Sequence, residues 1–374
     1  MLRRIFSLSI KEFIHLRNDW WLPAFMLIGG AMELVLVGWA TSRPITNLPL
    51  MVLDHDYSAA SREMVIALEN TGTFQLEDQV DNLEVIEEAI ERGQITAAVI
   101  IPPDYSEQLG SSRGHPTLAV ILNGAESVPA TAALQAIEGV VRDVGERVAI
   151  QRLGMAPEDI AGFVPSLRVW FNEALSEALY TTPAELGLML EFTILLFAAL
   201  TFSRERELGT LEQLLVMPFS SVEIIIGKAI PVILVGFLDF VLLLGLTHFA
   251  FDVPIRGSLP LLLLLALVYT LAMLCVGMVI SVISRNQHQA FLFVMIVGMV
   301  DFMFTGYAAP VESMPLVMQY IANIIPSYHW LTILRGISLK GIGLEILWLN
   351  VVALAILGLV IGIFSLRFIR RALD

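Results

Sequence analysis

Long runs of apolar residues divide this chain into segments that can each cross a lipid bilayer. A spanning helix needs about 20 mostly apolar residues. Six stretches meet that length, at residues 21–41, 184–202, 224–250, 259–283, 290–308 and 344–366. The first is too long for the apolar part of a cleaved signal peptide and runs on without a clear cleavage site. The pattern predicts an α-helical polytopic membrane protein with six spans, the first acting as an uncleaved anchor.

Residues 1–20 show a second kind of periodicity, in which apolar positions recur with helical spacing among charged ones. The apolar positions are Leu2, Ile5, Phe6, Phe13 and Leu16. This pattern favours an amphipathic helix on the inner membrane surface. The alternative is a plain extension of the first span.

A third pattern fills residues 42–183, where short apolar runs alternate with helical periodicity. Strands are predicted at 49–54, 94–101 and 117–122, and helices at 58–70, 83–92 and 128–153. The apolar face of the last helix is predicted to consist of Leu134, Ile137, Val141, Val144 and Val148. Alternating strands and helices predict an inserted α/β domain with a mixed sheet, and about 140 residues can bury a core of their own.

Composition explains an unusual charge. Of all residues, 56% are hydrophobic and 16% charged, and the mean hydropathy is +0.76. Soluble domains average about 25% charged residues, so a simple soluble enzyme is excluded. The net charge of −14 is unusual for a membrane protein, but residues 42–183 alone hold 21 Asp and Glu against 8 Arg and no Lys. The acidity therefore describes the surface of the soluble domain, not the charge of a substrate.

Lys and Arg in the short flanks of the spans set the orientation, because these residues accumulate on the cytoplasmic side. Eleven of them flank the spans on the side of both termini, against three on the other side, Arg256, Arg335 and Lys340. Both termini are therefore predicted to be cytoplasmic. The α/β domain is predicted to be extracytoplasmic, outside the inner membrane of a bacterial cell.

The connection between the second and third spans, residues 204–228, reads RERELGTLEQLLVMPFSSVEIIIGK. Gly209 suits the position after a helix end, and Thr210 with Gln213 has the spacing of a capping box. Ser220 with Glu223 repeats that spacing at the start of the third span. A short crosswise helix is therefore predicted between the two spans. Its charged neighbours are expected to face water or another protein: Arg204, Glu205, Arg206, Glu207 and Glu212.

This connection resembles the signature of the permease subunit of ABC type-2 exporters. Further similar strings follow in order, VPIRGS at 253–258, TGYAAPVESMP at 305–315 and IIPSYHWLTILRG at 324–336. Within residues 42–183, the strings DHDYSAASREMV, AAVIIPPDYSEQL and ILNGAE look like the variant of the family with a large external domain. The sequence departs from the family pattern at Met217 and Asp239.

The resemblance implies that the short helix, at about 204–219, is a coupling helix that docks on a cytoplasmic ATPase. It also implies short re-entrant helices at about 309–343, where prolines interrupt any continuous helix. No G-x-x-x-x-G-K-[ST] phosphate loop occurs in the chain, so ATP and Mg²⁺ would be bound by the partner and no cofactor by this chain. The implied ATPase-coupling residues are Arg204, Glu205, Glu207, Gly209, Thr210 and Glu212.

Four acidic residues fall inside predicted spans, Glu33, Glu191, Asp239 and Asp301. Each costs on the order of 2–3 kcal/mol or more at the bilayer centre and usually faces protein or water. They either line a substrate path or subunit interface, or are hydrogen-bonded to neighbouring helices. Asp239 is the most central. No metal site is predicted, because His55 has no second His or Cys at ligand spacing, and no catalytic nucleophile–base set can be assembled.

Together these features predict the permease subunit of an ATP-driven exporter for a small molecule or lipid-like substrate, drugs included. The expected partners are the ATPase, a second copy or a related permease, membrane lipid and a periplasmic adaptor protein, with no nucleic acid. Two alternatives stay open. One is a non-transporting envelope protein that binds a ligand; the other is an ion-coupled secondary transporter that uses the intramembrane acids.

Overall fold

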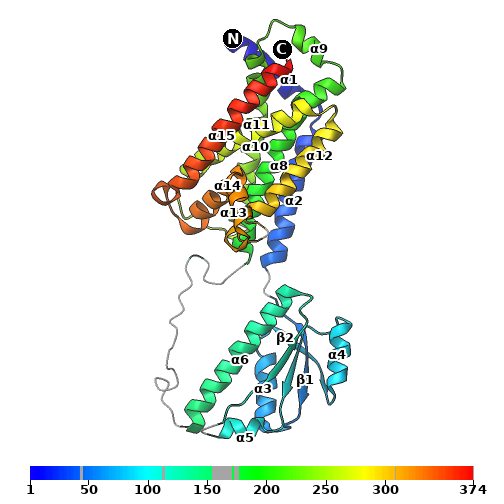
Figure 1. Cartoon of the computed structure of the whole chain (residues 1–374), viewed down its shortest axis with the longest axis vertical. Coiled ribbons are helices and arrows are strands. Elements are labelled where there is room, and N and C mark those ends of the chain that lie inside the picture. Colours follow the sequence, from blue (N-terminus) through cyan, green and yellow to red (C-terminus); the bar gives the residue numbers. More distant parts are fainter. Residues whose placement is uncertain (43–44, 112–113, 154–170, 172–176, 308, 374) are drawn as a thin grey trace. The chain divides into compact units, whose positions relative to one another are not determined.

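The computed structural model describes residues 1–42, 45–111, 114–153, 171, 177–307 and 309–373. The chain folds as two compact units (Figure 1). One consists of Met1–Arg43 and Val169–Asp374 and holds the long apolar helices; we call it the membrane unit. The other, Pro44–Arg168, contains the β-sheet and is called the α/β unit.

The membrane unit confirms six helices long and apolar enough to cross a bilayer. They are α2 (Trp21–Ser42), α8 (Glu177–Glu207), α10 (Ser221–Phe251), α11 (Leu259–Ile283), α12 (Gln287–Phe304) and α15 (Leu344–Leu373). The helix α8 begins well before the apolar run that predicted it, with Pro183 inside its second turn. Conversely, α12 ends at Phe304, because Gly306 adopts a positive φ of 83° that breaks the helix.

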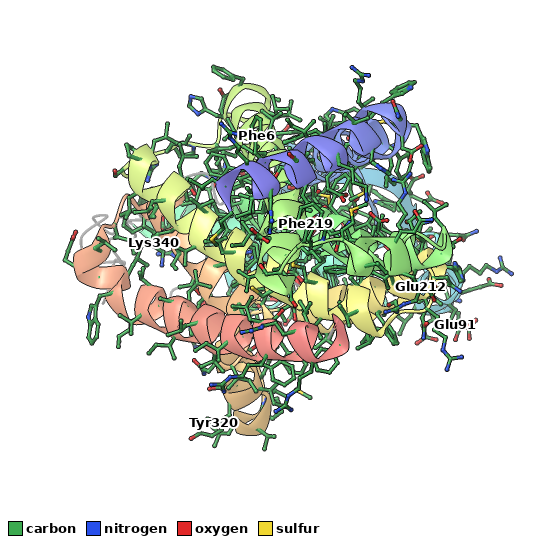
Figure 2. The ribbon with its side chains drawn as sticks, turned by 90° about the horizontal axis from the view of Figure 1, so that it is seen from above. Phe6, Glu91, Glu212, Phe219, Tyr320 and Lys340 are labelled. Carbon is green, nitrogen blue, oxygen red and sulfur yellow. The ribbon has the colours of Figure 1, made fainter. Side chains whose placement is uncertain are left out.

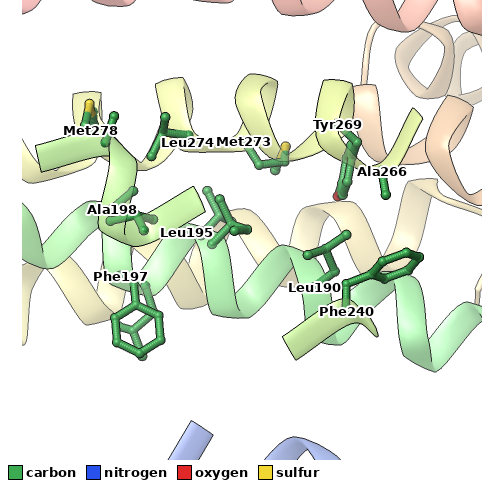
Figure 3. Close-up of a cluster of buried hydrophobic side chains, with 14 of the residues drawn as sticks. Leu190, Leu195, Phe197, Ala198, Phe240, Ala266, Tyr269, Met273, Leu274 and Met278 are labelled. Carbon is green, nitrogen blue, oxygen red and sulfur yellow. The ribbon is translucent and has the colours of Figure 1, made fainter. Parts of the chain in front are cut away.

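The helix α8 lies at the centre of the membrane unit. Of the residues in its most apolar segment, 78% are buried inside the protein, compared with 11% for the corresponding segments of α2 and α15. It packs against α11, and Leu195 of α8 and Met273 and Leu274 of α11 lie between the two helices in Figure 3. At Gly277 a Cβ would lie 2.6 Å from that of Ala198, so glycine permits the close approach of the two helices.

Between α12 and α15 the chain makes only short helices. They are η1 (Val311–Ser313), α13 (Leu316–Asn323), α14 (Pro326–Arg335) and the π-helical turn η2 (Gly336–Lys340). Pro310, Pro315 and Pro326 stand at their boundaries, as expected from the missing N–H of proline. Insertion of this segment into the bilayer stays a prediction.

The α/β unit contains a mixed four-stranded sheet in the order β2-β1-β3-β4. Its elements are β1 (Leu48–Asp54), α3 (Ala59–Glu69), β2 (Phe74–Val80), α4 (Leu83–Glu91), β3 (Ala97–Ile101), α5 (Tyr105–Gly110), β4 (Ala119–Leu122) and α6 (Ser127–Leu153). The strands β2, β1 and β3 are parallel and β4 is antiparallel to β3. The helices α3 and α6 cover one face, and α4 covers the other (Figure 1).

Two elements of this unit escaped the sequence pattern. The strand β2 is an edge strand with little apolar character, since only Phe74 is buried in it, and α5 is only six residues long. The apolar face expected for α6 was also partly wrong. Ile137 and Val144 are buried, but Leu134 and Val141 are exposed. The neighbouring Ala133 and Val140 are buried in their place.

Candidate functional site

The predicted coupling segment lies at the end of the membrane unit that carries both chain termini (Figure 1). After α8 ends at Glu207, Gly209 adopts a φ of 70°, which confirms the expected left-handed residue past a helix end. The short helix α9 spans Leu211–Val216. The capping box of Ser220 and Glu223 is present at the start of α10 and is confirmed.

The capping box predicted at Thr210 was wrong. Thr210 does not accept a hydrogen bond from the backbone of α9; its hydroxyl donates to the Glu205 carboxylate and to the Glu205 carbonyl. A carboxylate is a stronger acceptor than a neutral oxygen, so the hydroxyl turns back toward α8. The start of α9 is thereby tied to the last turn of α8.

Glu205 is the centre of an ion network of Glu205, Lys228, Lys11 and Glu12, which we call the buried ion network after its buried members Glu205 and Lys228. The side chains of Lys11 and Glu12 are 37% and 17% exposed. The side chain of Glu205 is 7% exposed, and its Oε1 accepts from Lys11 Nζ at 2.6 Å and from Lys228 Nζ at 3.0 Å. Lys228 is fully buried and also donates to Glu12 Oε1 at 2.6 Å and to the Thr201 carbonyl at 3.1 Å. Two lysines thus balance two glutamates, as a buried cluster of charges requires.

The charged residues around α9 were expected to face water or another protein, but Glu205 is buried and Arg204 and Arg206 are half-buried against the rest of this chain. Arg206 donates to the carbonyls of Val282 and Ser284 at the end of α11. Arg204 pairs with Asp19, and Glu207 accepts from the backbone of Gln287 at 2.9 Å. Glu207 and Glu212 are both exposed, and Glu212 stands at the outer edge of α9 (Figure 2).

The N-terminal helix α1 (Leu2–Asn18) holds both ends of the α9 segment. Its Lys11 contacts Glu205, which binds Thr210 before α9, and its Arg4 donates to the Pro218 carbonyl after α9 at 2.7 Å. Figure 2 looks onto this end, with α1 seen lengthwise. The helix also packs tightly on α10, where a Cβ at Gly227 would lie 2.6 Å from that of Leu8.

Sequence reasoning missed the central role of Lys228. The count of Lys and Arg that set the orientation included Lys228 as a cation of the connection at residues 204–228. In the structure Lys228 belongs to α10, and its side chain has no exposed surface. The available signal was its setting, because Lys228 follows a capping box by two turns and stands in an apolar run. A lysine in such a run predicts a buried partner.

The surface left free by these contacts is partly apolar. On and beside α9, Val216 is 85% exposed, Leu208 58% and Met217 49%. Large exposed apolar residues beside charged ones are typical of a protein-binding surface. We call these three residues, with Glu212, the α9 surface.

Comparison with known proteins decides the family. The sequence model of the family described as ABC-2 family transporter protein matches residues 20–367 of this chain. The chain belongs to the ABC-2 transporter family. The resemblance seen in the coupling segment is thereby confirmed for nearly the whole length of the permease.

Curated relatives of this ABC-2 permease come from Escherichia coli K12. The probable multidrug ABC transporter permease YbhR is 26% identical over 99% of both chains. The probable multidrug ABC transporter permease YbhS is 27% identical, covering 99% of this chain and 97% of its own. The inner membrane transport permease YhhJ is 28% identical, and the match covers 98% of this chain and 97% of YhhJ.

The four intramembrane acids of the permease do not form one site. Glu191 and Asp301 meet through Tyr269 and Ser327, a cluster described further below. Asp239 is buried elsewhere and accepts a hydrogen bond from Thr193 at 2.7 Å. Sequence reasoning did not single out these hydroxyl partners, which have no periodicity of their own.

Glu33 differs from the other three acids because it is exposed. It borders a cavity of about 300 Å³ between α2, α8 and α12. The lining is mostly apolar and aromatic, with Phe25, Met26, Phe192 and Met295 among its side chains. Such a cavity suits an apolar ligand with one polar or cationic group.

The polar turn after β1 has a structural role. Asp54 accepts from the backbone of Asp56 and Tyr57 and from the Ser61 hydroxyl. In the nearby α5, burial raises the pKa of Tyr105 to about 12. Across the described residues, no three His, Cys, Asp or Glu side chains are placed to hold a metal ion.

Proposed function

We propose that this ABC-2 permease is the transmembrane subunit of an ATP-driven exporter and that α9 couples it to a separate cytoplasmic ATPase. The observation that carries the proposal is the Glu205 centre. One carboxylate joins the start of α9, the end of α8, α1 and α10 through Thr210, Lys11 and Lys228. A push on α9 therefore reaches two spanning helices without a flexible link.

The buried ion network makes that link stiff. Ion pairs away from water are stronger than exposed ones, and removing one partner of a buried pair leaves an uncompensated charge. The ATPase would bind ATP and Mg²⁺, since the permease has no phosphate loop. Its closure on ATP would move α9, and with it α1 and the inner ends of α8 and α10, as one body.

The topology that serves this function has α9 and both termini in the cytoplasm and the acidic α/β unit outside the inner membrane. The distribution of Lys and Arg supports it, with eleven on the side of the termini against three opposite. Outside the membrane, the α/β unit is a candidate contact for a periplasmic adaptor protein.

The cavity beside Glu33 is the candidate substrate site. Its aromatic and methionine lining fits hydrophobic drugs or lipid-like molecules, and two of the relatives carry the word multidrug in their names. The same face exposes Phe25, Met32 and Met299, at 65%, 58% and 69%. A second copy or a related permease against this face would close the pathway between two subunits.

The experiment is co-purification of the permease with its ATPase from gently solubilised membranes, followed by ATPase measurement. We expect Val216→Asp on the α9 surface to release the ATPase. Val128→Asp is the matched control, because Val128 is also exposed, at 53%, but lies at the start of α6 in the α/β unit. Absence of any ATPase with the unmodified permease would remove the exporter proposal; full retention by Val216→Asp would remove α9 as the docking site.

A further inference from the structure

Four buried side chains from four helices form a continuous chain of polar contacts inside the membrane unit. The Tyr269 hydroxyl of α11 lies 2.9 Å from Glu191 Oε2 of α8 and 2.9 Å from the Ser327 hydroxyl of α14. Ser327 Oγ lies 2.6 Å from Asp301 Oδ2 of α12. The exposed fraction is 0% for Tyr269, 1% for Glu191, 2% for Ser327 and 6% for Asp301.

The number of hydrogens available to this row of polar contacts decides the charge of its two carboxyl groups. The chain has three oxygen–oxygen contacts, and each hydrogen bond needs one hydrogen between its oxygens. Tyr269 and Ser327 supply one hydroxyl hydrogen each. If both carboxyl groups were ionised, one of the three contacts would hold two oxygens with no hydrogen between them. At least one further proton is therefore required on a carboxyl group.

A second observation points to the same missing hydrogen. Glu191 Oε1 is buried and has no hydrogen-bond donor among the described residues. An ionised Glu191 would keep an anionic oxygen there without any hydrogen to accept. A single proton on Glu191 Oε2 supplies the third hydrogen of the polar contacts and makes the carboxyl group neutral, so that Oε1 is no longer an anionic oxygen without a donor.

The surroundings offer no other counter-charge. In the described part of the chain, other titratable groups on the surrounding helices have partners of their own: Glu185 with Tyr307, Arg335 with Tyr180 and Gly306, Asp239 with Thr193, and His329 with Asn350 and Asn323. The adjoining cavity measures about 10 Å³, which is at the lower limit for one water molecule. A proton fits this site, and a metal ion with its shell of oxygen ligands does not.

We propose that Glu191 and Asp301 form a proton-binding site that holds one shared proton between α8 and α12. The proton resides mainly on Glu191, because this carboxyl is the more deeply buried and has the unpartnered oxygen, while the charge stays on Asp301. Loss of the proton would leave two negative charges in one buried cluster, joined only through Tyr269 and Ser327, and push α8 and α12 apart. The site is independent of the proposed coupling to an ATPase and would operate in the permease alone.

The test is infrared spectroscopy of the full-length permease in lipid nanodiscs at neutral pH, with choline as the only buffer cation. A protonated carboxyl group gives a carbonyl stretching band that ionised carboxylates lack, and the band shifts in D₂O. We expect this band in the unmodified chain and its loss in Glu191→Gln. Asp239→Asn, which alters another buried acid, should leave the Glu191 component in place.

Tyr269→Phe gives a second result if Glu191→Gln fails to fold. It removes the hydrogen bond at Glu191 Oε2, so the band should move to a new frequency. The proposal would be overturned if the unmodified permease gave no such band. It would be overturned equally if the band remained in Glu191→Gln or kept its frequency in Tyr269→Phe. A band that disappears when sodium replaces choline would assign the site to a metal cation instead and would overturn it equally.

Discussion

The ion network around Lys228 and the carboxyl pair of Glu191 and Asp301 are both buried in the membrane unit, but they neutralise their charges differently. The ion network sets two lysines against two glutamates. The carboxyl pair has no cation among the partners of the described residues, only hydroxyl groups. The first cluster is therefore stabilised by charge balance and the second, in our proposal, by a proton.

This difference has consequences for how each cluster responds to substitution. Replacing one ion of the network by a neutral residue leaves an uncompensated charge shielded from water, which lowers the free energy of unfolding. A neutral amide in the carboxyl pair replaces a group that is already uncharged. The same chemical change should thus have opposite consequences in the two clusters, and the predictions below run from the largest effect to the smallest.

Lys228→Met should have the largest effect. It leaves Glu205 and Glu12 without the fully buried cation between them, and breaking a buried ion pair costs about 3–5 kcal/mol. Thermal unfolding of the purified permease should start at a clearly lower temperature. The matched control is Arg92→Met, which removes the cation of an exposed pair with Glu88 on α4 and should leave the midpoint nearly unchanged. Equal midpoints for the two variants would refute a charge-balanced network.

Glu205→Gln should destabilise the permease by about 3 kcal/mol, because Lys228 then keeps a single glutamate and Lys11 none. The effect should appear both in the unfolding midpoint and in substrate-stimulated ATPase activity of the proposed complex. Glu212→Gln is the control, since Glu212 is exposed on α9 and should not change the midpoint. If both glutamines behaved alike, Glu205 would have no special place.

Thr210→Val removes the hydroxyl that ties α9 to Glu205 while keeping the volume of the side chain. We expect a loss of about 1–2 kcal/mol, the usual value for a hydrogen bond to a charged group, together with a several-fold fall in substrate-stimulated ATPase activity. The ATPase itself should still co-purify. Thr332→Val is the control, because among the described residues that hydroxyl donates to the Tyr328 carbonyl within its own helix α14; an equal fall there would argue against a specific role of Thr210.

Glu191→Gln should have the smallest effect on stability, below about 1 kcal/mol, because a neutral amide replaces a neutral carboxyl and can still donate to the Tyr269 hydroxyl. Comparing its unfolding midpoint with that of Glu205→Gln tests the contrast between the clusters directly. A loss for Glu191→Gln as large as for Glu205→Gln would mean that Glu191 is charged in the folded permease.

The sequence predicted the elements that depend on local properties. Six long apolar runs predicted six candidate spanning helices, and Gly209 and the pair Ser220–Glu223 marked a helix end and a helix start that the structure confirms. The extracytoplasmic position of the α/β unit, the cytoplasmic termini and the roles of the coupling residues stay predictions. The capping role of Thr210 failed because a distant carboxylate offered a better acceptor than the adjacent backbone.

By itself, therefore, the sequence determined which segments can enter a bilayer, where helices start and stop, and to which family of permeases the chain is similar. All of these follow from composition, spacing and motifs within a few residues of one another. Only the tertiary structure decided that Lys228 meets Glu12 and Glu205, and that Glu191 meets Asp301. These partners come from separate helices, and their charges are set by burial and by neighbours that no local pattern records.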